Sequence, residues 1–304
     1  MKITVIFTGG TIACSNRNGA LSPDGANSFT LIEIYRALDG SVEFETLSPY
    51  FILSENLGCE HWEKLSDCVK SVRGSDGVIV THGTDTMPYT AAYLGLKLGL
   101  CDIPVVLVSA AYPLSDSRSN GLDNFRGAVD FIRSGVGKGV FVSYRNSGEN
   151  VMIYRAASLL PHQPYSDSVL SLRDNYFAEL VSGEVVLNPD FEEESLGDFS
   201  ECKPNGKIIW LRAHPGMIYP PVDGAKAVLL EGYHSGTLPT AREDFKNFCK
   251  SANTAGVPLY LTGSEEGFDY ESKQAFDELG INVLPPMSPA TAFVMLLLKS
   301  HPKI

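Results

Sequence analysis

Short apolar runs alternate with amphipathic segments along most of the chain, and this alternation limits the possible folds more than any other feature. The run Val78-Ile79-Val80 is apolar throughout instead of alternating with polar residues. Strands buried on both faces have this pattern, and such strands belong to largely parallel sheets. The sequence therefore predicts a doubly wound, mostly parallel α/β domain. The expected strands cover residues 3–7, 42–46, 77–81, 105–109 and 139–143.

The segments between these strands have the spacing of amphipathic helices. Thr30 is followed three residues later by Glu33. This spacing is typical of a capping box, so we expect the first helix to begin there. The expected helices cover residues 31–38, 60–73, 90–98 and 121–133.

A change in composition divides the chain into two parts. Residues 188–206 are rich in acidic side chains and contain Pro189 and Pro204, a composition typical of a solvated linker. We therefore expect a larger N-terminal α/β domain over residues 1–187 and a smaller C-terminal α/β domain over residues 207–304. The second domain is expected to hold strands at 207–212, 227–231, 257–262 and 281–283, and helices at 242–255, 271–279 and 290–299.

Charge and residue spacing argue against several classes of function. The 304 residues carry a formal net charge of −12, which disfavours nucleic acid as a partner because phosphate binding requires Lys and Arg. The six cysteines form no C-x-x-C pair, and the six histidines show no H-E-x-x-H or H-x-H spacing. No metal site is therefore expected.

No apolar segment has the length that a membrane span needs. The apolar run at residues 3–7 is also too short for a signal peptide, and no small-residue cleavage site follows it. We expect a cytoplasmic protein with no membrane partner.

Two predicted strands are followed by turns rich in glycine and hydroxyl groups. Residues 8–12 are Thr-Gly-Gly-Thr-Ile, and residues 82–86 are His-Gly-Thr-Asp-Thr. Ligands of parallel sheets bind beyond the carboxyl ends of strands, where Thr11 could act as a nucleophile once a base removes its proton. Thr84 could hold a water or act as a second nucleophile, Asp85 could bind an ammonium group, and backbone N–H groups could stabilise an oxyanion.

A structural interpretation competes with this one. Glycine-rich turns are common in α/β folds, where Ser, Thr and Asp cap helices, so either motif alone is equally consistent with a turn. Two such motifs at strand ends of one sheet favour a site. His82, as a lone histidine, is expected to be a structural hydrogen-bonding group.

Other motifs do not match their patterns. Residues 8–11 lack the G-K-[ST] of a P-loop and the spacing of G-x-G-x-x-G. Residues 135–139 follow a helix and precede a strand, which favours a helix C-cap and turn. The serine at residues 232–236 is one place too late for a G-x-S-x-G elbow.

The two motifs together resemble those of the bacterial-type L-asparaginase/glutaminase family, of which this chain looks like a divergent member. Either motif alone would be a much weaker signal. The resemblance extends more thinly to Ser54 and to residues 104–110, 119–121, 124 and 232–237.

This resemblance implies a two-domain α/β amidohydrolase, usually a homodimer or homotetramer, that converts L-asparagine or a related small amino-acid amide to L-aspartate and ammonia without a cofactor. It makes Thr11 the acylated nucleophile and places Thr84 and Asp85 in the site as well. Asp85 would bind the substrate α-amino group and Ser54 the α-carboxylate. The implied substrate-binding residues are Gly10, Ser54, Glu55, Gly83, Asp85 and Ala110.

Two family features are not matched. The family carries a tyrosine on a mobile loop after the first motif, whereas Leu21 lies near that position here. Its catalytic lysine would fall between residues 150 and 173, a stretch without lysine in which Arg155 and Arg173 are the cationic candidates. Arginine stays protonated and cannot act as a general base at neutral pH. Glu55, a carboxylate beside Ser54, would favour a cationic group or lie outside the pocket.

Three functions are compatible with these residues to different degrees. The first is an amidohydrolase, and the second is a catalytically impaired amino-acid-binding protein of the same fold. The third is an amidotransferase subunit of the same superfamily, which is disfavoured because the first motif begins at residue 8 and the chain is acidic. In the family an acidic residue of another subunit completes the site, and Glu265 or Glu266 is the candidate here.

Overall fold

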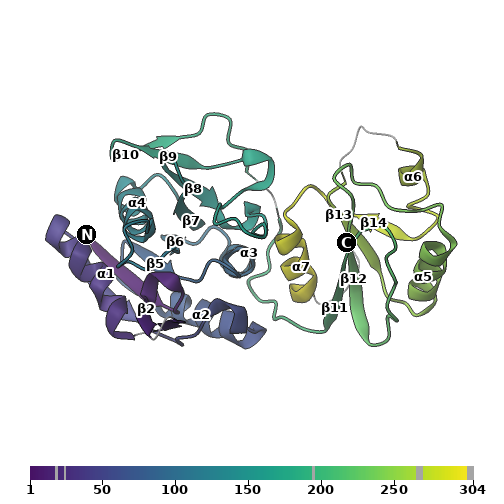
Figure 1. Ribbon diagram of the computed structural model, residues 1–304, viewed down its shortest axis with the longest axis horizontal. Helices are drawn as coiled ribbons and strands as arrows, with labels where there is room; N and C mark the ends of the chain where they lie inside the picture. The colour runs from purple at the N-terminus through teal and green to yellow at the C-terminus, as the bar shows by residue number, and fades with distance from the viewer. Residues whose placement is uncertain (18–19, 24, 194–195, 265–269, 300–304) are drawn as a thin grey trace. The chain divides into compact units, whose positions relative to one another are not determined.

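The computed structural model describes residues 1–17, 20–23, 25–193, 196–264 and 270–299. The chain forms two compact units, Met1–Ser200 and Glu201–Ile304, each with its own sheet (Figure 1). Residues 188–206 lie in sequence between the last strand of one sheet and the first strand of the other, and their role as a linker stays a prediction.

Unit 1 is built on an eight-stranded sheet with the strand order β10-β9-β8-β7-β6-β5-β1-β4. Strands β4, β1, β5, β6 and β7 are parallel, and β8, β9 and β10 continue the sheet in antiparallel pairs. The mostly parallel sheet is therefore confirmed. The bounds are β1 Lys2–Phe7, β4 Glu43–Leu47, β5 Gly77–Thr81, β6 Pro104–Val108, β7 Gly139–Arg145, β8 Val151–Arg155, β9 Ala178–Val181 and β10 Glu184–Leu187.

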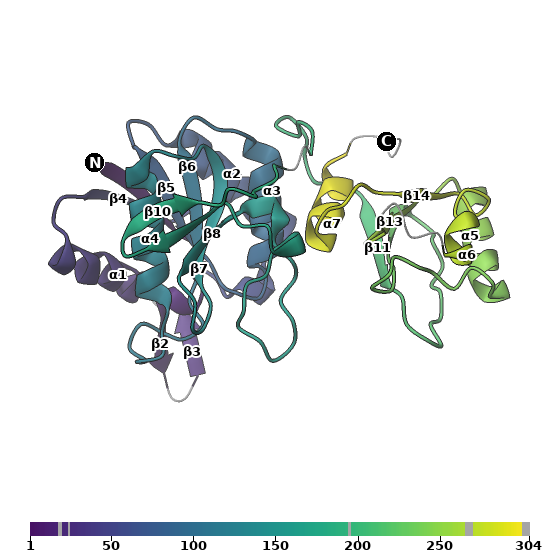
Figure 2. The ribbon, with the colours of Figure 1, turned by 90° about the horizontal axis from the view of Figure 1, so that it is seen from above.

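Helices cover both faces of this sheet, as Figures 1 and 2 show. Helices α1 (Gly25–Leu38) and α4 (Gly121–Ser134) share one core with the β1 residues Ile3, Val5 and Phe7. Helices α2 (Cys59–Ser71) and α3 (Met87–Leu98) pack against each other, and the Trp62 indole donates a hydrogen bond to Thr90 Oγ1 at 2.9 Å. Buried β-branched residues line both faces, as a doubly wound sheet requires.

Unit 2 has a four-stranded parallel sheet of β11 (Lys207–Arg212), β12 (Ala225–Glu231), β13 (Leu259–Thr262) and β14 (Ile281–Val283). Phe245 and Phe248 of α5 (Glu243–Thr254) belong to the core on one face. Helix α7 (Pro289–Leu298) packs on β11 and β12, and its Phe293 stacks on Trp210. The short α6 (Glu271–Gln274) precedes β14.

The predicted start of the first helix is wrong. Helix α1 begins at Gly25, so Thr30 and Glu33 lie inside it and form no capping box. The helix expected at 271–279 is shorter, because regular helix ends at Gln274. The hairpin of β2 (Cys14–Arg17) and β3 (Ala20–Pro23) was not predicted, nor were β8, β9 and β10.

In the described part of the chain, no helix combines the length and apolarity that a bilayer crossing requires.

Candidate active site

The two sequence motifs leave the sheet from neighbouring strands. Strands β1 and β5 pair in parallel along their length, and their last residues, Phe7 and Thr81, are register partners. The Thr8 hydroxyl then donates a hydrogen bond to the Thr81 carbonyl at 2.6 Å. The motifs therefore begin side by side at the carboxyl edge of the sheet.

Gly10 lies against the second motif so closely that no other residue fits. Its φ is +83°, and a Cβ on Gly10 would overlap the backbone of His82 and Gly83. Glycine adopts such a backbone conformation without a steric penalty. The chain after β1 is thus fixed directly on the chain after β5.

Ser54 joins this contact from a third segment. It begins the 3-10 turn Ser54–Asn56 and is buried, and its side chain occupies the space that a Cβ on Gly83 would need. The Thr86 hydroxyl donates to the Ser54 carbonyl at 3.0 Å. Gly10, Gly83 and Ser54 are therefore brought together, and Glu55 on the same turn is exposed.

Thr11 lies between two fixed neighbours. It begins the 3-10 turn Thr11–Ala13 and is partly buried. Gly10 before it contacts the second motif, and the buried Ile12 after it packs near Gly121. Gly121 also lies against Ala110, which follows β6 and is fully buried.

Thr84 and Asp85 form the turn before α3. The Met87 N–H donates to the Thr84 carbonyl at 3.2 Å as that helix begins. Thr84 is partly buried and Asp85 is exposed. The positive end of the α3 dipole adjoins this turn and favours negative charge there.

His82 is buried and neutral. Its Nδ1 donates to the Gly83 carbonyl at 2.8 Å, and desolvation lowers the pKa of the imidazole to about 4. Its Nε2 is buried without a partner in the described part of the chain. These contacts suit a structural role and not that of a base that titrates near neutral pH.

A family model described as "Asparaginase, N-terminal" matches residues 2–185. The chain belongs to the asparaginase family. Among its relatives, a glutamyl-tRNA(Gln) amidotransferase subunit from Metallosphaera sedula is 30% identical over 97% of this chain and 71% of the relative.

Solved structures share the fold of this asparaginase-family chain. The thermostable L-asparaginase from Thermococcus kodakarensis superimposes with a TM-score of 0.79 at 24% identity, covering 98% of this chain and 92% of that one. A Campylobacter jejuni protein named "Probable Cytoplasmic L-asparaginase" gives a TM-score of 0.73 at 24% identity over 98% and 94%. Together these likenesses confirm the predicted two-sheet α/β fold.

Of the two cationic candidates for the family's lysine, Arg155 lies away from the strand ends that carry the motifs. Arg155 ends β8, which is antiparallel to β7, and pairs with Phe141 near the first residue of β7. That places it away from the carboxyl edge of the parallel strands, where it stacks on Phe141 and forms an ion pair with Glu193 at 2.7 Å. Arg173 is exposed on the 3-10 turn Leu172–Asp174.

The same stretch supplies a histidine that the sequence motifs did not reveal. Burial lowers the pKa of the His162 imidazole, and the negative charge of Asp85 acts on it in the opposite direction. The signal in the sequence was the residue type. Histidine has an unperturbed pKa near neutral pH, and His162 falls between residues 150 and 173, where the family has its lysine.

Two expectations concern residues that are described in part or not at all. Glu265 and Glu266 lie outside the described residues. In the segment 18–23, which contains Leu21, residues 18 and 19 also lie outside them.

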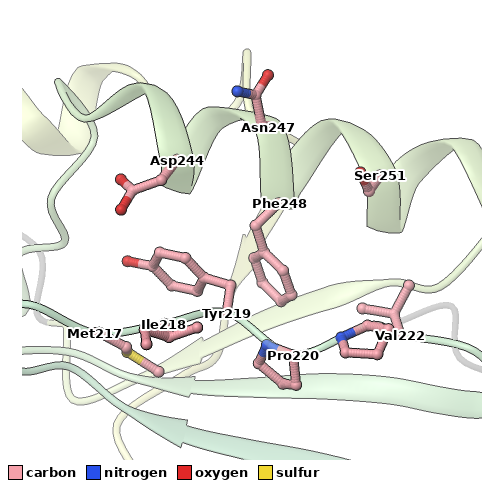
Figure 3. A pocket seen from close by; sticks show the side chains of 10 residues that line it. Met217, Ile218, Tyr219, Pro220, Val222, Asp244, Asn247, Phe248 and Ser251 are labelled. Atoms are coloured by element: carbon pink, nitrogen blue, oxygen red, sulfur yellow. The ribbon is translucent and has the colours of Figure 1, made fainter.

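Unit 2 holds a separate hollow, shown in Figure 3, between α5 and residues 217–222. Tyr219 and Phe248 stack there with ring centroids 5.0 Å apart. None of the motif residues lines this hollow, so it is not part of the candidate active site.

Proposed function

We propose that this chain hydrolyses the side-chain amide of L-asparagine, or of a related small amino-acid amide, to the acid and ammonia, with Thr11 as the nucleophile. The observation that carries the proposal is the packing of Gly10 on the His82–Gly83 backbone with Ser54 against Gly83. This packing brings together three segments that are distant in sequence, and these segments carry Thr11, Ser54 and the pair Thr84 and Asp85.

The chemistry follows from these residue types. The Thr11 hydroxyl attacks the amide carbon and loses its proton, and the C–N bond breaks as the nitrogen gains a proton and leaves as ammonia. Water then attacks the Thr11 ester, releasing the acid and returning a proton to the Thr11 oxygen. Backbone N–H groups at the strand ends suit the developing oxyanion.

The proposed binding roles extend this scheme. Asp85 binds the substrate ammonium group, and the Ser54 hydroxyl binds its α-carboxylate. Thr84 holds the attacking water, while Gly10, Gly83 and Ala110 line the site and let the substrate approach the backbone. Glu55, exposed beside Ser54, favours a substrate that carries a cationic amino group.

The test is ammonia release by purified protein from a panel that includes asparagine, glutamine and related amides. We expect turnover with at least one amide, a loss of at least about 10³-fold in Thr11→Ala, and partial retention in Thr11→Ser, because removal of a nucleophile leaves only residual catalysis. Folded protein that binds amino acids by calorimetry without releasing ammonia would instead establish a catalytically impaired binding protein.

A second candidate is the role named for the Metallosphaera sedula relative, that of a subunit of a glutamyl-tRNA(Gln) amidotransferase. The similarity to that subunit extends over 97% of this chain, which favours the subunit role. In that role the chain supplies ammonia for amide formation on tRNA and works with a partner subunit. Purification from the native source under mild conditions tests it, since a stoichiometric partner protein or bound tRNA supports the subunit role and an assembly of this chain alone contradicts it.

For the amidohydrolase we also propose a homodimer or homotetramer. We propose a cytoplasmic location as well, in line with the name of the Campylobacter jejuni neighbour. Sedimentation analysis of the purified chain measures the assembly, and a monomer at all concentrations contradicts it.

A further inference from the structure

His162 lies close enough to Asp85 for the charge of that carboxylate to act on its imidazole. Its Nε2 is buried, and no group in the described part of the chain forms a hydrogen bond with it. A buried polar atom without a hydrogen-bond partner destabilises the folded chain, because it loses the hydrogen bond that water would supply. A bound ligand that supplies the missing hydrogen-bond partner would remove this penalty.

The loop that carries His162 is held at the carboxyl edge of the sheet. Asn146, directly after β7, uses its side chain to accept from the Val169 N–H at 2.9 Å and to donate to the Val169 carbonyl at 3.0 Å. The Tyr144 hydroxyl donates to the Asp167 carbonyl at 2.9 Å. The ends of the loop pair through Leu160 and Leu170, so the histidine is carried on an anchored segment.

The surroundings of His162 define what it can bind. Burial keeps the pKa of its imidazole below the usual 6.5 and outweighs the groups that act in the other direction. Those groups are the Ser168 backbone, which forms a hydrogen bond with it, Asp85 from the turn before α3, and Asp167 from its own loop. The imidazole is therefore neutral at neutral pH, and one of its nitrogens can accept a hydrogen bond.

We infer that His162 Nε2 accepts a hydrogen bond from the substrate ammonium group beside Asp85, and that it thereby selects ligands with an α-amino group. An ammonium group has three N–H donors, so a carboxylate and a neutral imidazole can both accept from it. This role rests on the proposed function, because it deepens the recognition assigned to Asp85.

Equilibrium binding separates this role from catalysis. The full-length chain is titrated by calorimetry with L-aspartate and with succinate, which lacks the amino group. In His162→Leu we expect the Kd for L-aspartate at about pH 7.5 to rise about tenfold to hundredfold, since a hydrogen bond to a charged group contributes about 1.5–3 kcal/mol. The Kd for succinate changes by less than about threefold.

His162→Gln keeps an acceptor that does not titrate. We expect it to bind L-aspartate close to wild-type affinity and to lose the acid limb. This limb is the rise in the Kd of the wild type as the pH falls through the lowered pKa of the His162 imidazole, which then gains a proton. His214→Leu, which removes an exposed histidine of unit 2, is the matched control and leaves both affinities unchanged.

The outcomes are distinct. Equal weakening of L-aspartate and succinate in His162→Leu assigns His162 a structural role and overturns the inference, as does no change or the absence of binding by the wild type. The wild type could bind L-aspartate but release no ammonia from any amide. The hydrolase proposal then fails, while the affinities of His162→Leu still decide whether His162 recognises the α-amino group.

Discussion

At the residue scale, His82 shows how a histidine inside a motif can be structural. Its imidazole is fully buried and bonded to the adjacent Gly83 carbonyl. Desolvation penalises the protonated form and lowers the pKa to about 4, against 6.5 for the exposed group. Between these two values the unfolded chain binds a proton that the folded chain does not, so stability falls as pH falls.

This difference predicts a pH-dependent stability. We expect the free energy of unfolding of unit 1 to fall by about 3 kcal/mol between about pH 6.5 and pH 4 because of His82 alone. His82→Asn removes the titrating group, so the free energy of unfolding of this variant should fall over the same pH range by about 3 kcal/mol less than that of the wild type. Denaturant titrations across the range measure both proteins, and identical losses would contradict the assignment.

Ser54 was expected only from the family resemblance and His162 was not expected at all, because only the tertiary fold brings them near the motifs. The turn that places Ser54 against Gly83 comes from a segment after β4, nearly thirty residues earlier in the chain. A loop that no local sequence pattern predicts brings His162 within range of the charge of Asp85. Thr11, Thr84 and Asp85 were proposed because they follow apolar strands, and their catalytic roles stay predictions.

At the scale of elements, the site depends on one backbone contact between two strand exits. Gly10 and Gly135 both have positive φ, at +83° and +68°. A Cβ on Gly10 would overlap the His82 and Gly83 backbone, whereas a Cβ on Gly135, at the end of α4, meets nothing within 4 Å. Substitutions at the two glycines therefore differ in one respect: both introduce backbone strain, but only the substitution of Gly10 also introduces steric overlap.

We expect Gly135→Ala to cost about 1 kcal/mol, the penalty of a left-handed conformation. Gly10→Ala adds overlap with backbone that cannot move aside, so it should cost at least about 2 kcal/mol more and abolish L-aspartate binding. Chemical denaturation and calorimetry measure these effects. Equal destabilisation by the two substitutions would show that the strand exits are not packed this closely.

The parallel strands were predictable because each is a continuous apolar run, and the run at 77–81 matches β5 at both ends. The antiparallel strands β8, β9 and β10 were missed because each contains partly exposed positions, and β9 and β10 have only four residues each. The capping box at Thr30 failed because α1 extends one and a half turns before it, through residues whose polar character resembles a loop.

At the scale of the whole molecule, each unit has a hydrophobic core of its own. Each also carries one of the two tryptophans of the chain. Trp62 of α2 is buried and stacks on Tyr93 in unit 1. Trp210 of β11 donates to Glu231 at 3.1 Å and stacks on Phe293 in unit 2.

These tryptophans allow the two units to be followed separately. In Trp210→Phe the fluorescence reports unit 1, and in Trp62→Phe it reports unit 2. A ligand that binds only the folded form stabilises it by about 2.7 kcal/mol at a hundredfold excess over Kd. Because the proposed L-aspartate site lies within unit 1, we expect L-aspartate at that excess to raise the free energy of unfolding reported by Trp62 by that amount, and the unfolding midpoint to rise with it.

The midpoint reported by Trp210 should then stay unchanged, since a separate core lets unit 2 unfold without releasing the ligand. Succinate at the same concentration serves as the control, because it lacks the group that Asp85 and His162 are proposed to bind. An equal rise at both tryptophans would mean that ligand binding couples the two cores, and a rise at Trp210 alone would place the L-aspartate site in unit 2.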